Sequence, residues 1–341
     1  MLDRWLYLCD QPGSWGDFMA GMRIVKQMKM DGPPHIMYAA INEWTSRVAC
    51  GMPIYEGIFD NVISIPAGCE TTECLIEFLS RRLSNLDFDR IILGCLFDVD
   101  IDKLAESLGW NNSSYYSAAF HDYYKEVIGN RLLQELPRES AEYYRAYSIE
   151  ESILPLVSTL DKNKHNISIH PLSTRKYGAI YPEAMEIIVD ALYEKYNVIV
   201  LGTEFQLYSN NLYGGIYNSS PHDINAIRKS KFIEKCYDWI GLSPLKQLSI
   251  MKRCNYNIIS TTGAHVWSYL YDLPMIVING GEWECMYYEQ FCRSLSHIDC
   301  LCERFPCKDD TRMSKCKDVP ICYASGINID GLMNYIGGIG I

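Results

Sequence analysis

The stretch WLYLCDQPGSWGDFMAGMRIVKQM, residues 5–28, decides the fold. It opens with an apolar and aromatic run at 5–9, which is typical of a short buried strand. After a loop that contains Gly13 and Gly16, apolar residues return at roughly helical spacing from Phe18 onward. Strand, glycine loop and helix in this order begin a βαβ unit. The stretch therefore predicts that the chain starts with an α/β domain.

The same alternation of strands and helices continues along the chain. In the first block, strands are expected at 35–39, 61–65 and 90–95, and helices at 42–50, 71–84 and 101–108. A polar linker follows at 158–165, and the second block then gives strands at 167–170, 197–201, 256–259 and 275–278 with helices at 182–195, 244–253 and 264–271.

Length and composition suit two α/β domains. The chain has 341 residues, of which 48% are hydrophobic, which is enough to fill two cores. Two doubly wound Rossmann-like domains would face an interdomain cleft, and such clefts bind ligands. We expect the domains at 1–157 and 166–325, followed by a C-terminal helix or tail at 326–341.

Charge and hydropathy limit the partners. The formal net charge is −11, so the surface as a whole repels phosphate backbones and disfavours nucleic acid as a partner. No apolar run approaches the roughly 20 residues that span a bilayer, and the N-terminus lacks the apolar core of a signal peptide. The sequence thus predicts a cytoplasmic protein without a transmembrane segment.

Asp17 is the first candidate functional residue. It stands directly before the first predicted helix, where a carboxylate can cap free backbone N–H groups. On that interpretation Gly16 only permits the turn. On the alternative interpretation, Asp17 projects into the cleft and takes the proton of an incoming hydroxyl as a general base. Gly13, Trp15 and Gly16 would then form the acceptor-side loop.

The second block opens with ISIHPLSTRKYGAIYPEAMEII, residues 167–188. A strand is followed by a loop with Ser173, Thr174 and Lys176, and Pro182 marks the first turn of the next helix. Hydroxyls and a lysine after a strand of an α/β domain can hold a diphosphate, with the lysine as a point charge. The alternative is a solvated surface loop.

Two further loops offer donor-binding residues. In VIVLGTEF a strand ends before Gly202, and Glu204 stands where a carboxylate could accept hydrogen bonds from a ribose; the alternative is an ordinary loop carboxylate. In the segment TTGAH, small residues begin a helix and can bind an anion, whereas a lone histidine is more often a packed or capping residue. The candidates here are Thr261, Thr262, Gly263 and His265.

The order of these motifs resembles glycosyltransferase family nine, the GT-B enzymes related to lipopolysaccharide heptosyltransferases. Their G-D pair in the first loop is similar to Gly16-Asp17, and their small, hydroxyl-rich loop with a lysine before W-P-E is similar to LSTRKYGAIYPE. Their D-S/T-G-x-x-H-x-A-x-A-x-x-x-P signature looks like TTGAHVWSYLYDLP, with Thr262, Gly263 and Pro274 at matching separation. The resemblance spans most of residues 4–280.

This resemblance implies transfer of a sugar from a nucleotide-diphosphate donor to an acceptor hydroxyl. Asp17 would be the general base, inversion at the anomeric carbon would result, and no catalytic metal would be required. The donor diphosphate would rest on the second domain and the acceptor on the first. Apart from the resemblance, the tyrosine-rich composition of residues 110–150 suggests that they lie on the acceptor side. An acceptor glycan, a protein serine and a modified nucleobase all stay open.

The sequence also departs from the family signature. Thr261 replaces the aspartate before the glycine, and the histidine stands one place early at His265. These departures leave two alternatives open: a catalytically inactive binding protein of GT-B fold, and a nucleotide-sugar epimerase on a related fold.

Cysteines gather near the C-terminal end. Seven of the fourteen lie between Cys285 and Cys322. Thiolates in a segment poor in apolar periodicity could hold a structural zinc or iron, whereas buried free thiols and disulfides are the alternatives. An aromatic helix followed by cysteines is similar to the autotransporter heptosyltransferases, which hold a metal on cysteines. The candidate ligands are Cys300, Cys302, Cys307, Cys316 and Cys322.

Overall fold

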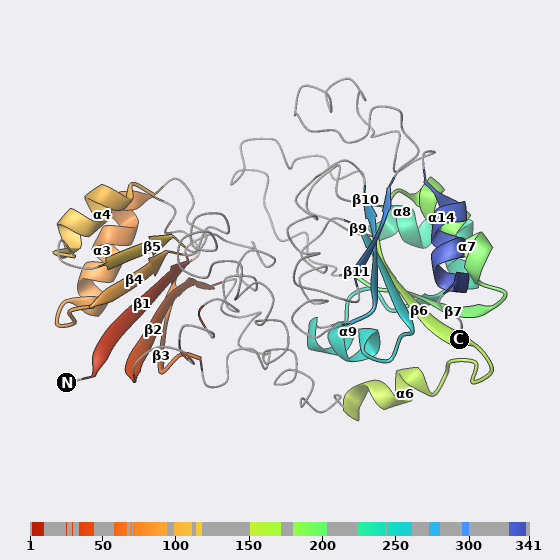
Figure 1. Ribbon diagram of the computed structural model, residues 1–341, viewed down its shortest axis with the longest axis horizontal. Coiled ribbons are helices and arrows are strands. Elements are labelled where there is room, and N and C mark those ends of the chain that lie inside the picture. Colours follow the sequence, from red (N-terminus) through yellow and green to blue (C-terminus); the bar gives the residue numbers. More distant parts are fainter. Residues whose placement is uncertain are drawn as a thin grey trace, which may run out of the picture. The chain divides into compact units, whose positions relative to one another are not determined.

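The computed structural model describes residues 2–9, 25, 29, 34–43, 58–66, 69, 71–93, 99–110, 114–117, 151–171, 180–202, 224–242, 244–260, 273–279, 295–299 and 327–338. The chain divides into two compact units, Met1–Tyr147 and Ser148–Ile341, so the division lies ahead of the predicted linker 158–165. Each unit contains one parallel β-sheet with flanking helices (Figure 1).

The first unit is built on a five-stranded sheet. All neighbouring strands run parallel, in the order β3-β2-β1-β4-β5. The chain proceeds from β1 outward to β3 and then returns to place β4 on the other side of β1. This reversal makes the boundary between β1 and β4 the topological switch point, where ligands bind in doubly wound folds. The strands are β1 (Asp3–Cys9), β2 (His35–Asn42), β3 (Asn61–Ile65), β4 (Arg90–Leu93) and β5 (Ser114–Ser117).

The central strand β1 is buried on both faces, which explains its uninterrupted apolar run. Leu6 and Leu8 pack into the cluster beneath the helices, and Trp5 and Tyr7 are buried although they alternate with those leucines along the strand. A half-exposed strand would instead alternate apolar and polar residues.

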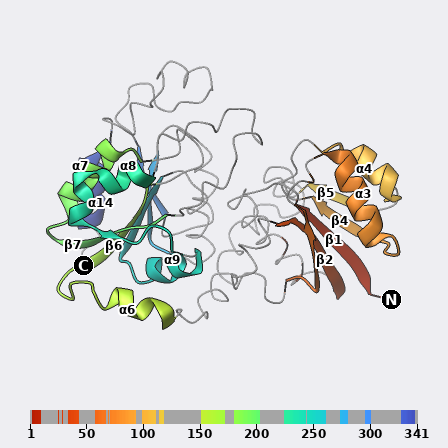
Figure 2. The same cartoon turned by 180° about the vertical axis from the view of Figure 1, so that it is seen from behind.

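Helices α3 (Thr72–Leu83) and α4 (Ile101–Leu108) cover one face of this sheet (Figure 2). A side chain caps each helix start: Thr71 Oγ1 accepts from Cys74 N at 3.2 Å, and Asp100 Oδ1 accepts from Lys103 N at 3.0 Å. Gly109 ends α4 with a φ of 71°, a left-handed conformation that favours glycine. Both helices lie where the sequence pattern predicts them.

The second unit repeats the same topology with one more strand. Its parallel sheet has the order β11-β10-β9-β6-β7-β8, so β6 and β9 flank the switch point. Both units thus follow the Rossmann strand order. The strands are β6 (His165–His170), β7 (Tyr196–Val200), β8 (Tyr237–Asp238), β9 (Tyr256–Ser260), β10 (Met275–Asn279) and β11 (Leu295–Asp299).

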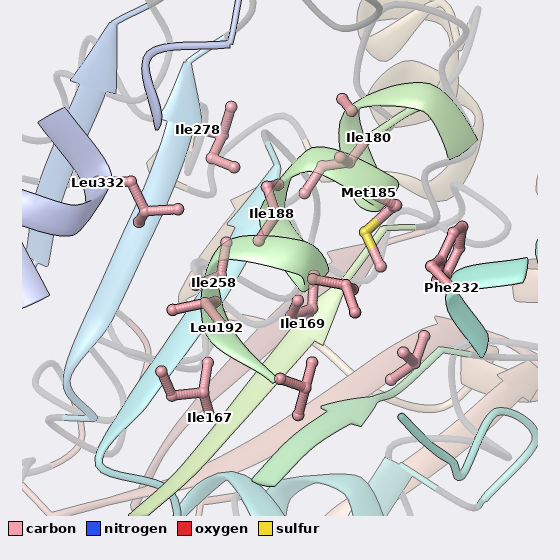
Figure 3. Close-up of a cluster of buried hydrophobic side chains, with 14 of the residues drawn as sticks. Ile167, Ile169, Ile180, Met185, Ile188, Leu192, Phe232, Ile258, Ile278 and Leu332 are labelled. Atoms are coloured by element: carbon pink, nitrogen blue, oxygen red, sulfur yellow. The ribbon is translucent and has the colours of Figure 1, made fainter. Parts of the chain in front are cut away.

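One face of the second sheet carries the larger core. Met185, Ile188 and Leu192 of α7 point towards the isoleucines of the sheet, and Leu332 joins them from α14 (Figure 3). Each such side chain contributes roughly 1.5–3 kcal/mol by leaving water. The elements on this face are α7 (Pro182–Leu192), α8 (Ile224–Lys229), the 3₁₀ helix η5 (Lys231–Lys235) and α14 (Ile329–Gly338).

On the opposite face, α9 (Pro244–Met251) is fixed through a buried polar network. Asn257 Nδ2 donates to Pro274 O at 2.9 Å and to Met251 O at 3.3 Å, and Ser168 Oγ donates to Asn257 Oδ1 at 2.6 Å. The network therefore joins β6, β9, the start of β10 and the end of α9. The short helices η3 (Glu151–Ile153) and α6 (Leu154–Val157) precede β6.

Candidate functional site

The candidate site lies at the carboxyl ends of the second unit's central strands. β9, β6 and β7 are consecutive in the sheet and parallel, so all three end at one edge. His170 and Ile259 are register partners at the switch point, and Leu201 N donates to Ile169 O at 2.9 Å. The three segments predicted to bind the donor all begin at this edge, after β6, β7 and β9.

His170 is the last residue of β6 and is buried, with 4% of its surface exposed. Side chains alternate along a strand, so His170 lies on the face of Ser168, opposite the face that packs on α7. Burial lowers the pKa of His170 from its ordinary 6.5 to about 3. The imidazole is therefore neutral near pH 7 and adds no positive charge to this edge of the sheet.

Gly202, which follows β7, is the one predicted site residue that the structure describes. It is buried, and its carbonyl oxygen accepts hydrogen bonds from Gly241 N at 2.9 Å and from Gln247 Nε2 at 3.2 Å. Gln247 also donates to Leu242 O at 2.7 Å. Gly202 thus ties the end of β7 to the turn before α9 and to α9 itself.

The turn that reaches Gly202 requires a glycine. Gly241 has a φ of 96°, in the region that residues with a Cβ rarely adopt. Sequence reasoning missed both Gly241 and Gln247. The signal for the first was present, since GLSP at 241–244 places a glycine and a proline just before a helix. Gln247 gives no such signal, because its role depends on a contact with residue 202.

The first unit presents a comparable edge at its own switch point. β1 ends at Cys9, whose register partner on β2 is Ile41, and Leu8 pairs with Leu93 on β4. The neighbouring strand β2 ends with the buried Asn42. The predicted acceptor-side loop follows β1 in the sequence, and ligands bind beyond the ends of such central strands in this fold class.

The other predicted site residues lie outside the described residues. They are Gly13, Trp15, Gly16 and Asp17 in the first unit, and Ser173, Thr174, Lys176, Glu204, Thr261, Thr262, Gly263 and His265 in the second. The predicted helix at 264–271 and the cysteines 300, 302, 307, 316 and 322 also fall outside. Within the described part of the chain, no group of three or more His, Cys, Asp or Glu residues could hold a metal ion.

The described residues also include no helix that is both long and apolar enough to cross a membrane.

No protein-family model and no curated protein matches this sequence.

Several solved glycosyltransferase structures have a similar fold. The glycosyl transferase family 9 structure from Veillonella parvula DSM 2008 matches with a TM-score of 0.63 at 12% identity, covering 99% of this chain and 98% of that chain. E. coli heptosyltransferase WaaC with ADP matches at 0.54 and 10% identity, covering 98% and 99%. The iron-containing dodecameric glycosyltransferase TibC from enterotoxigenic E. coli matches at 0.51 and 10% identity, covering 99% and 77%.

A structure of another enzyme class shares the fold. UDP-GlcNAc 2-epimerase from Neisseria meningitidis, bound to UDP-GlcNAc, matches with a TM-score of 0.52 at 10% identity, covering 98% of this chain and 99% of that chain. Sequence identities of 10–12% to these structures show a shared fold and nothing about function. The predicted fold class, α/β with two Rossmann-like doubly wound domains of GT-B type, is confirmed, and the chain has the fold of the family 9 glycosyltransferases.

Proposed function

We propose that this protein is a glycosyltransferase that uses a nucleotide-diphosphate sugar as donor. One observation carries the proposal: β9, β6 and β7 end side by side at the switch point of the second sheet. The segments that follow them hold the hydroxyls, the glycines and the lysine that suit a diphosphate. The likeness in fold to a heptosyltransferase with ADP supports the same function.

The donor site requires a source of positive charge. His170 is neutral at this edge, because burial lowers its pKa to about 3. We assign the charge to Lys176, in a loop that also contains Arg175, helped by backbone N–H groups around Ser173, Thr174 and Gly263. In this proposal Glu204 binds the ribose, and Thr261, Thr262 and His265 complete the donor site.

The proposed reaction is a single displacement. The acceptor oxygen forms a bond to the anomeric carbon as the bond from that carbon to the diphosphate oxygen breaks. The acceptor proton passes to Asp17, and the nucleoside diphosphate leaves with its charge stabilised by Lys176. Attack from the face opposite the leaving group inverts the anomeric carbon. These groups meet the leaving charge without a catalytic divalent cation.

The acceptor side is assigned to the first unit. Its loop after β1, with Gly13, Trp15 and Gly16, and the tyrosine-rich residues 110–150 would contact the acceptor. β5 lies within that range and carries Tyr115 and Tyr116, which pair in register with Ile91 and Ile92 of β4. A glycan, a protein serine and a modified nucleobase remain the candidate acceptors.

The test is binding and hydrolysis of a panel of ADP-, UDP-, GDP- and CDP-sugars. A donor that binds the folded state raises the melting temperature, and slow hydrolysis releases nucleoside diphosphate. Lys176→Met should abolish the shift, whereas the matched control Lys195→Met should keep it. A melting temperature that no nucleotide sugar raises would contradict the assignment.

An epimerase on the same fold is the second candidate, because a UDP-GlcNAc 2-epimerase shares this architecture. An epimerase would convert the free nucleotide sugar into its stereoisomer without an acceptor, whereas a transferase would release nucleoside diphosphate and form a glycoside. A binding protein that has lost catalysis would do neither. NMR spectra of the sugar anomeric protons distinguish the three.

The cysteine cluster remains a metal-site proposal. A structural zinc or iron on Cys300, Cys302, Cys307, Cys316 and Cys322 would be separate from the chemistry of transfer, and it is supported by the fold shared with an iron-containing glycosyltransferase. Metal analysis of the purified protein tests it, because a structural site retains about one ion per chain through dialysis.

A further inference from the structure

A hollow of about 350 Å³ opens at the amino-terminal ends of β7 and β8. Its volume is at the lower end of the range for ligand pockets. Tyr196 begins β7, Tyr237 begins β8, and Tyr193 lies just past the end of α7. The strands of this sheet are parallel, so the hollow lies at the end of the sheet opposite the proposed donor site.

Charged groups of both signs line the hollow. Lys164 and Lys235 lie there with Asp161 and Glu234, and Lys235 is paired with Asp190, which does not line the hollow. An ion of either sign is disfavoured as the ligand, because it would meet groups of its own sign at close range.

Hydrogen bonds hold both lysine side chains in place but do not use all of their N–H donors. Lys164 Nζ donates to Tyr193 O at 2.8 Å. Lys235 Nζ donates to Asp190 Oδ1 at 2.6 Å and lies 4.9 Å from the centre of the Tyr193 ring. An ammonium group has three N–H donors, so each lysine can still donate to a ligand without breaking these contacts.

The tyrosines supply further hydrogen-bonding groups and apolar ring surface. Tyr196 and Tyr237 line the hollow, and no hydrogen bond of either phenol hydroxyl is found among the described residues. Each hydroxyl can donate and accept. The rings add apolar area beside these polar groups.

We propose that the hollow binds a neutral, polyhydroxylated ligand, namely a single saccharide unit. Sugar hydroxyls both donate and accept, so they match a wall that presents ammonium donors, carboxylate acceptors and phenols together. The C–H faces of a pyranose ring are apolar and suit the tyrosine rings. The site is separate from the proposed donor site and does not depend on the proposed function.

The test is saturation-transfer NMR on the full chain with the methyl glycosides of glucose, galactose and mannose. Glucose 6-phosphate and glucosamine serve as charged comparators. The double variant Tyr196→Phe/Tyr237→Phe removes only the two hydroxyls, and Tyr335→Phe on α14 is the matched control because Tyr335 does not line the hollow. Melting temperatures verify that all variants fold.

We expect at least one neutral glycoside to bind the wild type and the Tyr335→Phe control equally. The double variant should raise its dissociation constant roughly tenfold, as expected for two lost hydrogen bonds. The proposal is overturned if no neutral glycoside binds, if only the charged sugars bind, or if the double variant binds as well as the wild type. Turnover of nucleotide sugars bears on none of these outcomes.

Discussion

Gln247 of α9 donates a hydrogen bond from Nε2 to the carbonyl oxygen of Gly202 at the end of β7, at 3.2 Å. The two residues are 45 positions apart in sequence. The same amide also donates to Leu242 O at 2.7 Å. Gln247 therefore holds the end of β7 and the turn before α9 together, at the carboxyl ends of the strands where the donor site is proposed.

Gln247→Met should therefore destabilise the second unit. The substitution keeps the length of the side chain but leaves buried carbonyl groups without this donor, which costs about 1–3 kcal/mol. Urea denaturation measures the change. Glu186→Met is the control, because Glu186 is exposed on α7, and it should change the free energy of unfolding little. Equal stability of the two variants would show that the amide contact contributes nothing.

The buried pair Ser168 and Asn257 should be energetically coupled. Their side chains share a 2.6 Å hydrogen bond, and both are fully buried. Ser168→Ala should cost about 1–2 kcal/mol because Asn257 Oδ1 loses its donor. Asn257→Leu should cost more because the carbonyl groups of Met251 and Pro274 also lose their amide donor. In a double-mutant cycle we expect the two effects to be non-additive by at least about 0.5 kcal/mol. Strict additivity would contradict the network.

His170 should make folding sensitive to acid. Its pKa is about 3 in the folded protein against an ordinary value of 6.5, so the unfolded chain binds more protons between these two pH values. Stability should fall as the pH drops from 6.5 towards 3, by up to about 1.4 kcal/mol per pH unit.

Two histidine variants distinguish the contribution of His170 from that of other groups that take up protons in acid. His170→Gln should flatten the pH dependence of the free energy of unfolding, and His165→Gln, on the exposed start of the same strand, is the matched control. If the two variants have the same slope between pH 6 and 4, His170 does not carry the effect.

Cys254 should resist alkylation in the folded protein. Burial raises the pKa of its thiol to about 12, and only the thiolate reacts readily. Iodoacetamide labelling at pH 8 with peptide mass spectrometry should leave Cys254 unmodified, whereas the same reaction in urea should modify it. Labelling at equal rates in both conditions would show that the region around the end of α9 opens readily.

The strands of both sheets could largely be predicted from sequence, because strands buried on both faces form short apolar runs. RIIL at 90–93 and YNVIV at 196–200 are examples. Three strands were missed: β5 consists of serine and tyrosine, β8 has two residues, and LSHID of β11 lies among the cysteines. These strands pair at or near the sheet edges, where the sequence is not constrained to be apolar.

The candidate site was predicted less completely. Loops after strands carry turn residues that sequence patterns detect, and Gly202 is one of them; its part in donor binding stays a prediction. Gln247, Ser168 and Asn257 could not, since a polar residue in an apolar segment gives no hint of a partner about 45 or 89 positions away. Such residues are recognised only once the fold has brought their partners together.

The central claim is that Asp17 removes the proton of the acceptor hydroxyl. Its most direct test is the rate of nucleoside diphosphate release from the donor identified by thermal shift, in Asp17→Asn beside Asp87→Asn, an exposed aspartate in the first unit. We predict that Asp17→Asn loses about 10²–10⁴-fold in turnover and keeps donor affinity, while Asp87→Asn matches the wild type. Turnover of Asp17→Asn at the wild-type rate would contradict the account.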